Sequence, residues 1–243
     1  GSEMCIRDSS NFECNRIKKA LHLCENQITA IYNGYNQHFH PIPDVASVTE
    51  KYIAGQEYLF FLGNTDPKKN VPRTLKAYSI YLKKSEKKRP LLIADLKEDK
   101  LDIILKEQGI EEIKPYLSYP GYIPNKDLAY LYNGAYAFLY TSLRESFGIP
   151  MLEAMACGTP VIAGNTSAMP EIAGEKGILA DPFNEEDIAN KLLLLENDHQ
   201  YYVGQVDYGL QRVNKFSWKS TALAANSPAT SSSWSTIPPA TAW

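Results

Sequence analysis

Short apolar runs alternate with amphipathic stretches from Tyr58 to Ala222, and this alternation limits the fold of the 243-residue chain more than any other feature. Continuous apolar runs are typical of strands buried on both faces of a parallel sheet, and amphipathic stretches are typical of the helices that cover it. The expected strands are YLFFL (Tyr58 to Leu62), PLLIA (Pro90 to Ala94), AYAFLY (Ala135 to Tyr140) and PVIAG (Pro160 to Gly164). The pattern predicts an α/β fold, a Rossmann-like parallel sheet with helices on both faces.

Residues that favour helix ends mark the helices between these strands. Pro72 is tolerated at the beginning of a helix because its missing amide would have no partner there. Gly109 is expected to end a later helix, and Asn125 and Asn184 are candidate caps at the beginning of two others. Acidic residues 185–187 then lie in a first turn, where the helix dipole favours negative charge.

The two ends of the chain have a different composition. Residues 1–10 (GSEMCIRDSS) resemble a foreign junction, and residues 226–243 are rich in Ser, Thr, Pro and Ala without periodicity. We expect no regular structure in either segment.

Charge and hydropathy exclude several classes of protein. A net charge of -3 and a pI of about 5.9 provide no basic surface of the kind that nucleic-acid binding needs. No apolar run approaches the length of a membrane span, and the first residues lack the apolar core of a signal peptide. The sequence therefore predicts a cytoplasmic protein with no transmembrane segment and no nucleic-acid partner.

The sequence contains no strong metal signature. The cysteines fall at irregular spacings without a CxxC pair, which argues against a disulfide scaffold and a structural zinc site. They are Cys5, Cys14, Cys24 and Cys157. His38 and His40 alternate and could clamp a metal, but no acidic or thiol ligand accompanies them, so the preferred interpretation is two surface imidazoles before a proline turn.

The stretch from Leu143 to Pro160 (LRESFGIPMLEAMACGTP) is the most informative part of the sequence. Gly148 permits close backbone approach, Pro150 suits the first turn of a short helix, and Gly158 suits its end. Free amides at that helix start would face the carboxyl edge of the sheet, where open α/β sheets bind ligands. We therefore predict a cradle for a phosphate or diphosphate.

Two carboxylates, Glu145 and Glu153, flank this cradle at a separation of eight positions. Carboxylates repel a diphosphate, so they are better explained as acceptors of hydrogen bonds from hydroxyl groups, a ribose diol on one side and a sugar ring on the other. Taken alone, the two residues are better explained by a solvated helix face and an exposed loop.

The sequence that contains these two carboxylates resembles that of a known family. The pattern E-x-F-G-x-x-x-x-E, followed by LEAMACGTPV, is similar to the EX7E motif of the family 4 glycosyltransferases, which have two Rossmann-like domains in the GT-B arrangement. The likeness extends in order over residues 28–222. The other matching stretches are IYNG (Ile31 to Gly34), FLGNTDPKKN (Phe61 to Asn70), PGYIPNKDLAYLYNGA (Pro120 to Ala135), SAMPEIAG (Ser167 to Gly174), DPFNEEDIA (Asp181 to Ala189) and FSW (Phe216 to Trp218).

The resemblance implies roles for the site residues. Glu145 would contact the hydroxyls of the donor sugar, Glu153 would hold the ribose, and Lys69 would neutralise the diphosphate leaving group, which makes Glu145 and Lys69 the catalytic candidates. The predicted base-reading segment includes Tyr122 and Ile123. The resemblance assigns the backbone amides that hold sugar and phosphate to Phe147, Gly148, Met151 and Leu152.

One position departs from the family pattern. The loop that includes Gly63 often carries an arginine directly after its glycine, and this chain has Asn64. An asparagine donates only neutral hydrogen bonds, so stabilisation of the leaving group is expected to weaken unless Arg73 or Arg144 compensates.

The resemblance also implies a reaction and a domain organisation. The reaction is transfer of a hexosyl group from a nucleoside diphosphate sugar to an acceptor hydroxyl, with retention and without a metal or other cofactor. Residues 1–50 would be the remnant of an N-terminal acceptor domain and a linker, 51–222 the nucleotide-sugar-binding C-terminal domain, and 223–243 a tail. The acceptor, a saccharide or a lipid, would bind the missing domain, and a lipid would bring peripheral membrane association. Such a chain would bind donor weakly and turn over poorly.

Two alternatives remain open from the sequence. A noncatalytic nucleotide-sugar-binding module would explain Asn64 as a site that has drifted. A GT-B relative such as a nucleotide-sugar epimerase would share the fold and the phosphate site. A dinucleotide dehydrogenase is disfavoured, because no GxGxxG follows a strand.

Overall fold

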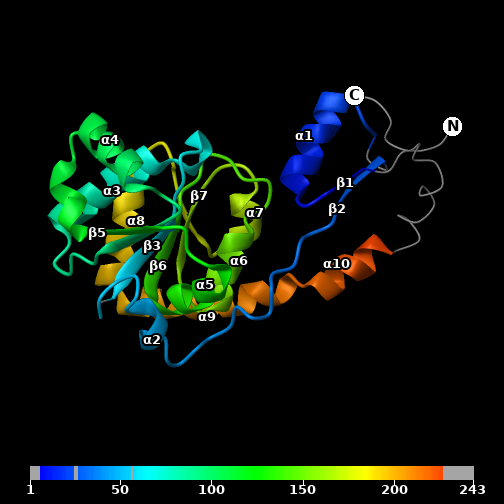
Figure 1. Cartoon of the computed structure of the whole chain (residues 1–243). Helices are drawn as coiled ribbons and strands as arrows, with labels where there is room; N and C mark the ends of the chain where they lie inside the picture. Colours follow the sequence, from blue (N-terminus) through cyan, green and yellow to red (C-terminus); the bar gives the residue numbers. More distant parts are fainter. Residues whose placement is uncertain (1–5, 25–26, 56, 227–243) are drawn as a thin grey trace.

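The computed structural model describes residues 6–24, 27–55 and 57–226, and its main body is a six-stranded, wholly parallel sheet (Figure 1). Its order is β5-β4-β3-β6-β7-β8. These strands are β3 (Tyr58–Leu62), β4 (Leu91–Ala94), β5 (Leu117–Gly121), β6 (Ala135–Tyr140), β7 (Val161–Gly164) and β8 (Ile178–Ala180). The four strands expected from apolar runs are all present, and the predicted Rossmann-like fold is confirmed.

Helices cover both faces of this sheet. The helices of the main body are α2 (Ala46–Thr49), α3 (Val71–Lys84), α4 (Glu98–Gln108), α5 (Asn125–Gly134), α6 (Ile149–Ala156), α7 (Met169–Ala173), α8 (Glu185–Asn197) and α9 (His199–Arg212). The short 3-10 helices are η2 (Pro67–Lys69), η3 (Glu111–Tyr116) and η4 (Val213–Lys215). Residues of α5, α6 and α7 form one buried apolar cluster with the sheet, and residues of α3, α4 and α8 form the other. Alternate strand residues feed the two clusters, as a sheet buried on both faces requires.

The direction in which the sheet is built reverses once. From β3 the chain proceeds outward through β4 to β5, then returns to place β6 on the other side of β3 and continues through β7 to β8. Loops that leave the carboxyl ends of β3 and β6 therefore lead to helices on opposite faces of the sheet. Open α/β sheets bind their ligands at such a reversal.

A smaller N-terminal lobe lies beside the main body (Figure 1). It consists of β1 (Ile6–Asp8), α1 (Asn11–Leu21) and β2 (Ile28–Ala30), with the two strands paired in parallel. The expectation of no regular structure in residues 1–10 is wrong for β1, because Ile6 to Asp8 pair along β2. Residues 1–5 lie outside the described residues.

The C-terminal part of the chain returns to this lobe. Helix α10 (Trp218–Ala225) follows η4, and Thr221 donates a hydrogen bond from Oγ1 to the carbonyl oxygen of Tyr32 at 2.6 Å. The predicted boundary between residues 222 and 223 falls inside α10, so the expected tail is helical as far as Ala225. Residues 227–243 lie outside the described residues.

The helix ends follow the expected residues with one exception. Gly109 ends α4 with a φ of 62°, and Asn184 caps α8 by accepting a hydrogen bond from the Asp187 amide at 3.1 Å. Asn125 is not a cap, because Pro124 occupies the cap position of α5 and Asn125 is already the first helical residue.

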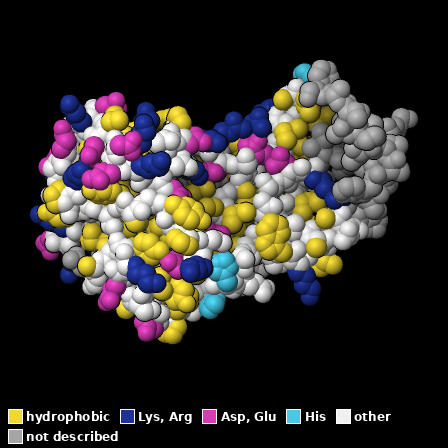
Figure 2. Space-filling model, in the orientation of Figure 1, with side chains coloured by type: hydrophobic (Ala, Val, Ile, Leu, Met, Phe, Trp, Pro, Cys, Tyr) yellow, Lys and Arg dark blue, Asp and Glu magenta, His cyan; other side chains and the backbone are white. Residues whose placement is uncertain are grey.

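Charged side chains cover part of the surface, and the described helices were compared with the requirements of a membrane span. On the face shown in Figure 2, acidic and basic side chains are interspersed over the main body. Among the described residues, no helix combines the length and the apolar character that crossing a bilayer would require.

A buried ion pair between Arg89 and Glu196 lies at the amino-terminal side of the sheet, with the exposed Glu57 as a further partner of Arg89. The guanidinium of Arg89, 8% exposed, contacts Glu57 and Glu196 at 2.8 Å each and stacks on the ring of Tyr136 at 3.6 Å. Glu196 is itself only 5% exposed. A buried carboxylate that loses its cation is costly, so Arg89 is a stability determinant.

Replacing Arg89 by Met should therefore lower the free energy of unfolding by about 3–5 kcal/mol, since it leaves the Glu196 carboxylate buried without its cation. Urea unfolding followed by circular dichroism measures the change. Lys84→Ala, which removes the exposed pair with Glu186, is the control and should cost less than about 1 kcal/mol. Equal losses in the two variants would contradict the assignment.

Candidate functional site

The loops that leave β3 and β6 meet at an ion pair. Nζ of Lys69 lies 2.8 Å from Oε1 of Glu145, with both side chains largely shielded from solvent. The ammonium also lies over the ring of Tyr140, the last residue of β6, at 5.4 Å from its centroid. The structure thus brings together the two predicted catalytic residues, 76 positions apart, at the reversal of the sheet.

A buried asparagine fastens the loops around this ion pair. Nδ2 of Asn70, 1% exposed, donates to the carbonyl oxygens of Thr141 at 3.0 Å and Pro182 at 2.7 Å. The Leu143 amide donates to the carbonyl oxygen of Lys68 at 2.7 Å. The Asn70 carboxamide and backbone groups therefore hold the loops after β3, β6 and β8 together, which fixes the backbone at Lys69.

The residues after β3 explain the departure at Asn64. Its Oδ1 accepts a hydrogen bond from the Asp66 amide at 2.9 Å and so begins the turn that leads to Lys69. A Cβ at Gly63 would lie 2.5 Å from Cε1 of Phe61, so the backbone runs too close to that ring for any side chain. Asn64 is thus an organiser of the loop in this structure.

Neither arginine proposed as a substitute contacts the ion pair. Arg144 lies 3.3 Å from Glu13 in the N-terminal lobe. Arg73 contacts Asn70 at 3.4 Å and lies over the ring of Phe183. The recorded contacts of both guanidinium groups therefore lead away from Lys69.

The predicted phosphate cradle precedes α6. Gly148 has a φ of 103°, a conformation that glycine adopts readily, and a Cβ there would crowd Met151 and Tyr140. Among the described residues, the amides of Phe147 and Gly148 donate to no acceptor. The Met151 amide donates to the Gly148 carbonyl oxygen at 3.0 Å, so it is not free in this structure. Leu152 lies in the first turn of α6 with its side chain fully buried.

Aromatic packing holds the cradle from behind. The ring of Phe147, 4% exposed, packs against those of Tyr32 and Phe216, with centroids 6.0 Å away in each case. These three rings come from the loop after β6, from the linker and from the residue that follows η4, so distant parts of the chain support one loop.

Glu153 faces a protein environment that disfavours its charge. Burial raises the pKa of Glu153 to about 7, and a weak hydrogen bond from the Tyr132 hydroxyl at 3.4 Å opposes part of that rise. Burial is also the main cause that raises the pKa of Tyr140, with further contributions from Glu145 and Glu153. Tyr140 therefore lies within the electrostatic reach of both carboxylates.

The predicted base-reading segment follows β5. Tyr122 is 78% exposed, whereas Ile123 is 4% exposed and belongs to the apolar cluster under α5. The segment lies at the carboxyl edge of the sheet, on the β4 and β5 side of the reversal. The structure thus places the predicted phosphate and base contacts along one edge of the sheet.

The N-terminal lobe touches the cradle directly. Ser10 donates from Oγ to the carbonyl oxygen of Ser146 at 2.7 Å. Glu171, on α7, accepts hydrogen bonds from the amides of Asn11 and Phe12 at 2.9 and 3.1 Å and from the Tyr32 hydroxyl at 2.6 Å. A side chain 160 positions away therefore satisfies the first amides of α1, which sequence spacing alone could not reveal.

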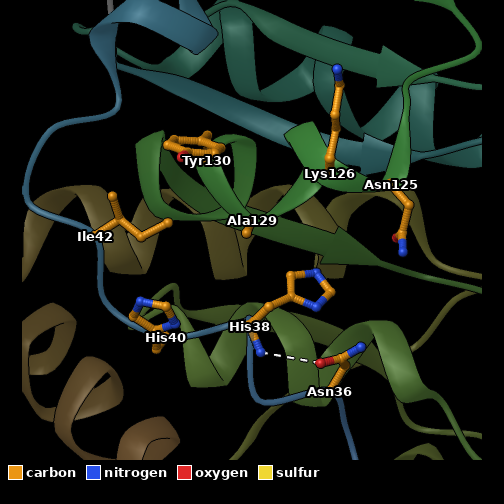
Figure 3. Close-up of a pocket in the computed structure, with 8 residues that line it drawn as sticks. All are labelled: Asn36, His38, His40, Ile42, Asn125, Lys126, Ala129 and Tyr130. Atoms are coloured by element: carbon orange, nitrogen blue, oxygen red, sulfur yellow. Dashed lines mark hydrogen bonds between the residues drawn. The ribbon is translucent and has the colours of Figure 1, made fainter.

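The two histidines line a separate pocket between the linker and α5, with a volume of about 640 Å³ (Figure 3). The imidazole of His38 and the carboxamide of Asn125 face the same space, and His40 stands beside Ile42. Nε2 of His38 is buried without a hydrogen-bond partner in the described structure. No cluster of three or more His, Cys, Asp or Glu residues suited to a metal occurs in the part of the chain that is described.

Comparisons with known proteins agree with this arrangement. A family profile described as "Glycosyl transferases group 1" matches residues 49–212. O-antigen chain mannosyltransferase B from Escherichia coli is 35% identical over 175 residues, covering 71% of this chain and 45% of that protein. The chain thus spans less than half the length of this curated relative.

Solved structures share the fold, and two of them serve as examples. Sucrose-phosphate synthase from Thermosynechococcus elongatus has a TM-score of 0.76 at 22% identity, over 90% of this chain and 56% of that one. Anabaena HepE in complex with UDP and glucose has a TM-score of 0.77 at 17% identity, over 91% and 61%. The fold is therefore the Rossmann-like fold of GT-B glycosyltransferases.

The raised pKa of Glu153 makes stability depend on pH. The folded state holds the proton more tightly than the unfolded chain, so the favourable contribution is complete below about pH 4.5 and is lost as pH rises to about 7. Glu153→Gln should therefore stabilise the unliganded chain little at pH 5 and by about 2–3 kcal/mol at pH 8.

Thermal unfolding of the wild type and of Glu153→Gln at pH 5 and pH 8 measures this difference in stability. Glu175→Gln is the control, because Glu175 is exposed and should show the same small effect at both pH values. A Glu153→Gln variant whose melting temperature differs from the wild type equally at both pH values would show that the carboxyl group is not desolvated.

Proposed function

The chain belongs to the glycosyl transferases group 1 family, and we propose that it is the donor-binding part of a retaining, metal-independent hexosyltransferase. The observation that carries this proposal is the Lys69–Glu145 ion pair at the reversal of the sheet, beside the free amides of Phe147 and Gly148. A nucleoside diphosphate sugar is the ligand whose parts match these groups. The acceptor, a saccharide or a lipid, binds a domain outside this chain.

The two members of the ion pair have different tasks toward the donor. The ammonium of Lys69 and the free amides stabilise the negative charge that develops on the diphosphate as the bond to the sugar breaks. The carboxylate of Glu145 accepts hydrogen bonds from sugar hydroxyls and holds Lys69 in position. Preorganised charge of this kind needs no rearrangement during the reaction.

Glu153 serves the ribose. A diol donates two hydrogen bonds to a carboxylate, and such bonds favour the charged form that burial disfavours. Binding of the nucleotide thus relieves an unfavourable feature of the empty site. The name of the Escherichia coli relative makes mannose the first hexose to test in the donor.

Removing the ribose contact should weaken nucleotide binding. Glu153→Ala is expected to lower affinity for a nucleoside diphosphate by roughly 5- to 150-fold, which corresponds to the loss of hydrogen bonds worth about 1–3 kcal/mol. Calorimetric titration with UDP, GDP and ADP measures it. A variant that binds the preferred nucleotide as tightly as the wild type would remove Glu153 from the site.

Removing the ammonium of Lys69 should weaken only the part of nucleotide binding that depends on the diphosphate. Lys69→Ala should weaken binding of the preferred nucleoside diphosphate by about tenfold or more and leave the weak binding of the nucleoside unchanged, since only the diphosphate meets the ammonium. Lys68→Ala is the matched control, because its neighbouring ammonium is exposed and pairs with Asp66. Equal effects of the two substitutions would contradict the role of Lys69.

A further inference from the structure

We infer that Glu13 and Arg144 are positioning residues for the carboxylate of Glu145, so that the small N-terminal lobe determines how tightly the sugar of the donor is held. The inference rests on the proposed function and adds to it a contribution from outside the main body. It also gives a role to Arg144, whose contact with Glu13 leads away from the Lys69 ammonium.

Glu13 lies in the first turn of α1, with its side chain only 3% exposed. Its two carboxylate oxygens have different partners. Nε of Arg16, one turn further along α1, donates to Oε2 at 2.6 Å, and Nη2 of Arg144, in the loop after β6, donates to Oε1 at 3.3 Å. A buried carboxylate is costly without a cation, so the burial of Glu13 favours a close contact with both guanidinium groups. Glu13 thus connects the lobe to the residue directly before Glu145.

The main body holds every second residue of the segment 143–146. The Leu143 amide donates to the carbonyl oxygen of Lys68 at 2.7 Å. The Glu145 amide donates to Oγ of Ser167, in the loop after β7, at 2.9 Å. These contacts fix the backbone at Leu143 and at the Glu145 nitrogen.

The small lobe holds the residues in between. Arg144 pairs with Glu13, and the carbonyl oxygen of Ser146 accepts from Oγ of Ser10 at 2.7 Å. Ser10 and Glu13 belong to one turn, because Ser10 is the cap of α1 and accepts a hydrogen bond from the Glu13 amide at 3.2 Å. The residues before and after Glu145 are therefore held by the same turn of the lobe.

The direction of the Glu145 side chain depends on the peptide groups on both sides of it. A fixed amide nitrogen alone leaves these peptide groups free to rotate, and the contacts of Arg144 and Ser146 remove that freedom. Hydrogen bonds weaken steeply when their distance or angle departs from the optimum. The lobe thus affects the hydrogen bonds that Glu145 accepts from the sugar.

The nucleotide end of the donor site has its own supports. The backbone at Lys69 is held by the Asn70 carboxamide, and Glu153 lies on α6 with Tyr132 of α5 as its hydrogen-bond partner. Both supports belong to the main body. Loss of the contact between Glu13 and Arg144 should therefore weaken binding of the sugar and leave binding of the nucleotide nearly unchanged.

Calorimetric titration of the full chain with matched ligand pairs tests this inference. The pairs are GDP with GDP-mannose, UDP with UDP-glucose and ADP with ADP-glucose. For the pair whose nucleotide binds most tightly, Arg144→Met should weaken binding of the nucleotide sugar by about fivefold or more and change binding of the nucleotide by less than about twofold. The variant keeps Glu13 paired with Arg16, so the buried carboxylate retains a cation.

Arg16→Met is the matched control, because Arg16 and Arg144 contact the same carboxylate and each side chain is 51% exposed. Arg16 lies on α1 and is not adjacent to Glu145, so its substitution should change neither affinity. Glu13→Gln should reproduce the effect of Arg144→Met. The double variant should lose no more sugar affinity than either single variant, since both remove the same contact.

Each other result has a distinct meaning. Equal losses of nucleotide and nucleotide-sugar affinity in Arg144→Met would show that Arg144 supports the whole site or meets the diphosphate, and would overturn the positioning role. Unchanged affinities, or equal effects of Arg16→Met and Arg144→Met, would overturn it as well and leave the proposed function intact. Wild-type protein that binds none of these ligands overturns the proposed function together with the inference.

Discussion

The contact between Lys69 and Glu145 depends on the order in which the sheet is assembled. Because β6 returns to the far side of β3, the loops that follow these two strands leave the sheet in opposite directions and meet only at their bases. Asn70 then fixes the meeting point from below by donating to the loops after β6 and β8. An ammonium and a carboxylate that would be mobile on a surface are thereby held in one geometry before any ligand arrives.

The neighbourhood of Glu153 shows how a site can be unfavourable when empty and suited to its ligand. The side chain lies over a buried apolar cluster, with a tyrosine hydroxyl at 3.4 Å as its contact from the protein. Burial raises the pKa of this carboxyl group to about 7, so its charge changes near neutral pH. Ligand hydroxyls that donate to it shift that balance toward the carboxylate. The buried carboxyl group therefore lowers the stability of the empty site at neutral pH, and ligand hydroxyls that donate to it would offset this loss.

The sequence allowed the central sheet to be predicted for one physical reason, and it singled out Lys69 and Glu145, which the structure brings together. Strands buried on both faces must be continuously apolar, so β3, β4, β6 and β7 were visible as runs. Strand β5 contains Pro120 and Gly121, and β8 has only three residues, so neither produces such a run. The cap expected of Asn125 failed because Pro124, which has the extended backbone that a cap position takes, occupies it one residue earlier. The surroundings of Tyr140 depend on which strand ends become neighbours, and those of Glu171 depend on how the small lobe packs against α7, neither of which a single sequence reveals.

The hydrogen bond from Ser10 to the Ser146 carbonyl oxygen couples the position of the small lobe to that of the loop after β6. That carbonyl and the free amide of Phe147 belong to one peptide group, directly after Glu145. A rotation of the small lobe relative to the main body must displace this peptide or break the hydrogen bond from Ser10. Glu171 opposes the rotation because it accepts hydrogen bonds from the first amides of α1. A change in the angle between the lobes would therefore change the spacing between Glu145 and the free amide of Phe147, the groups proposed to surround a sugar.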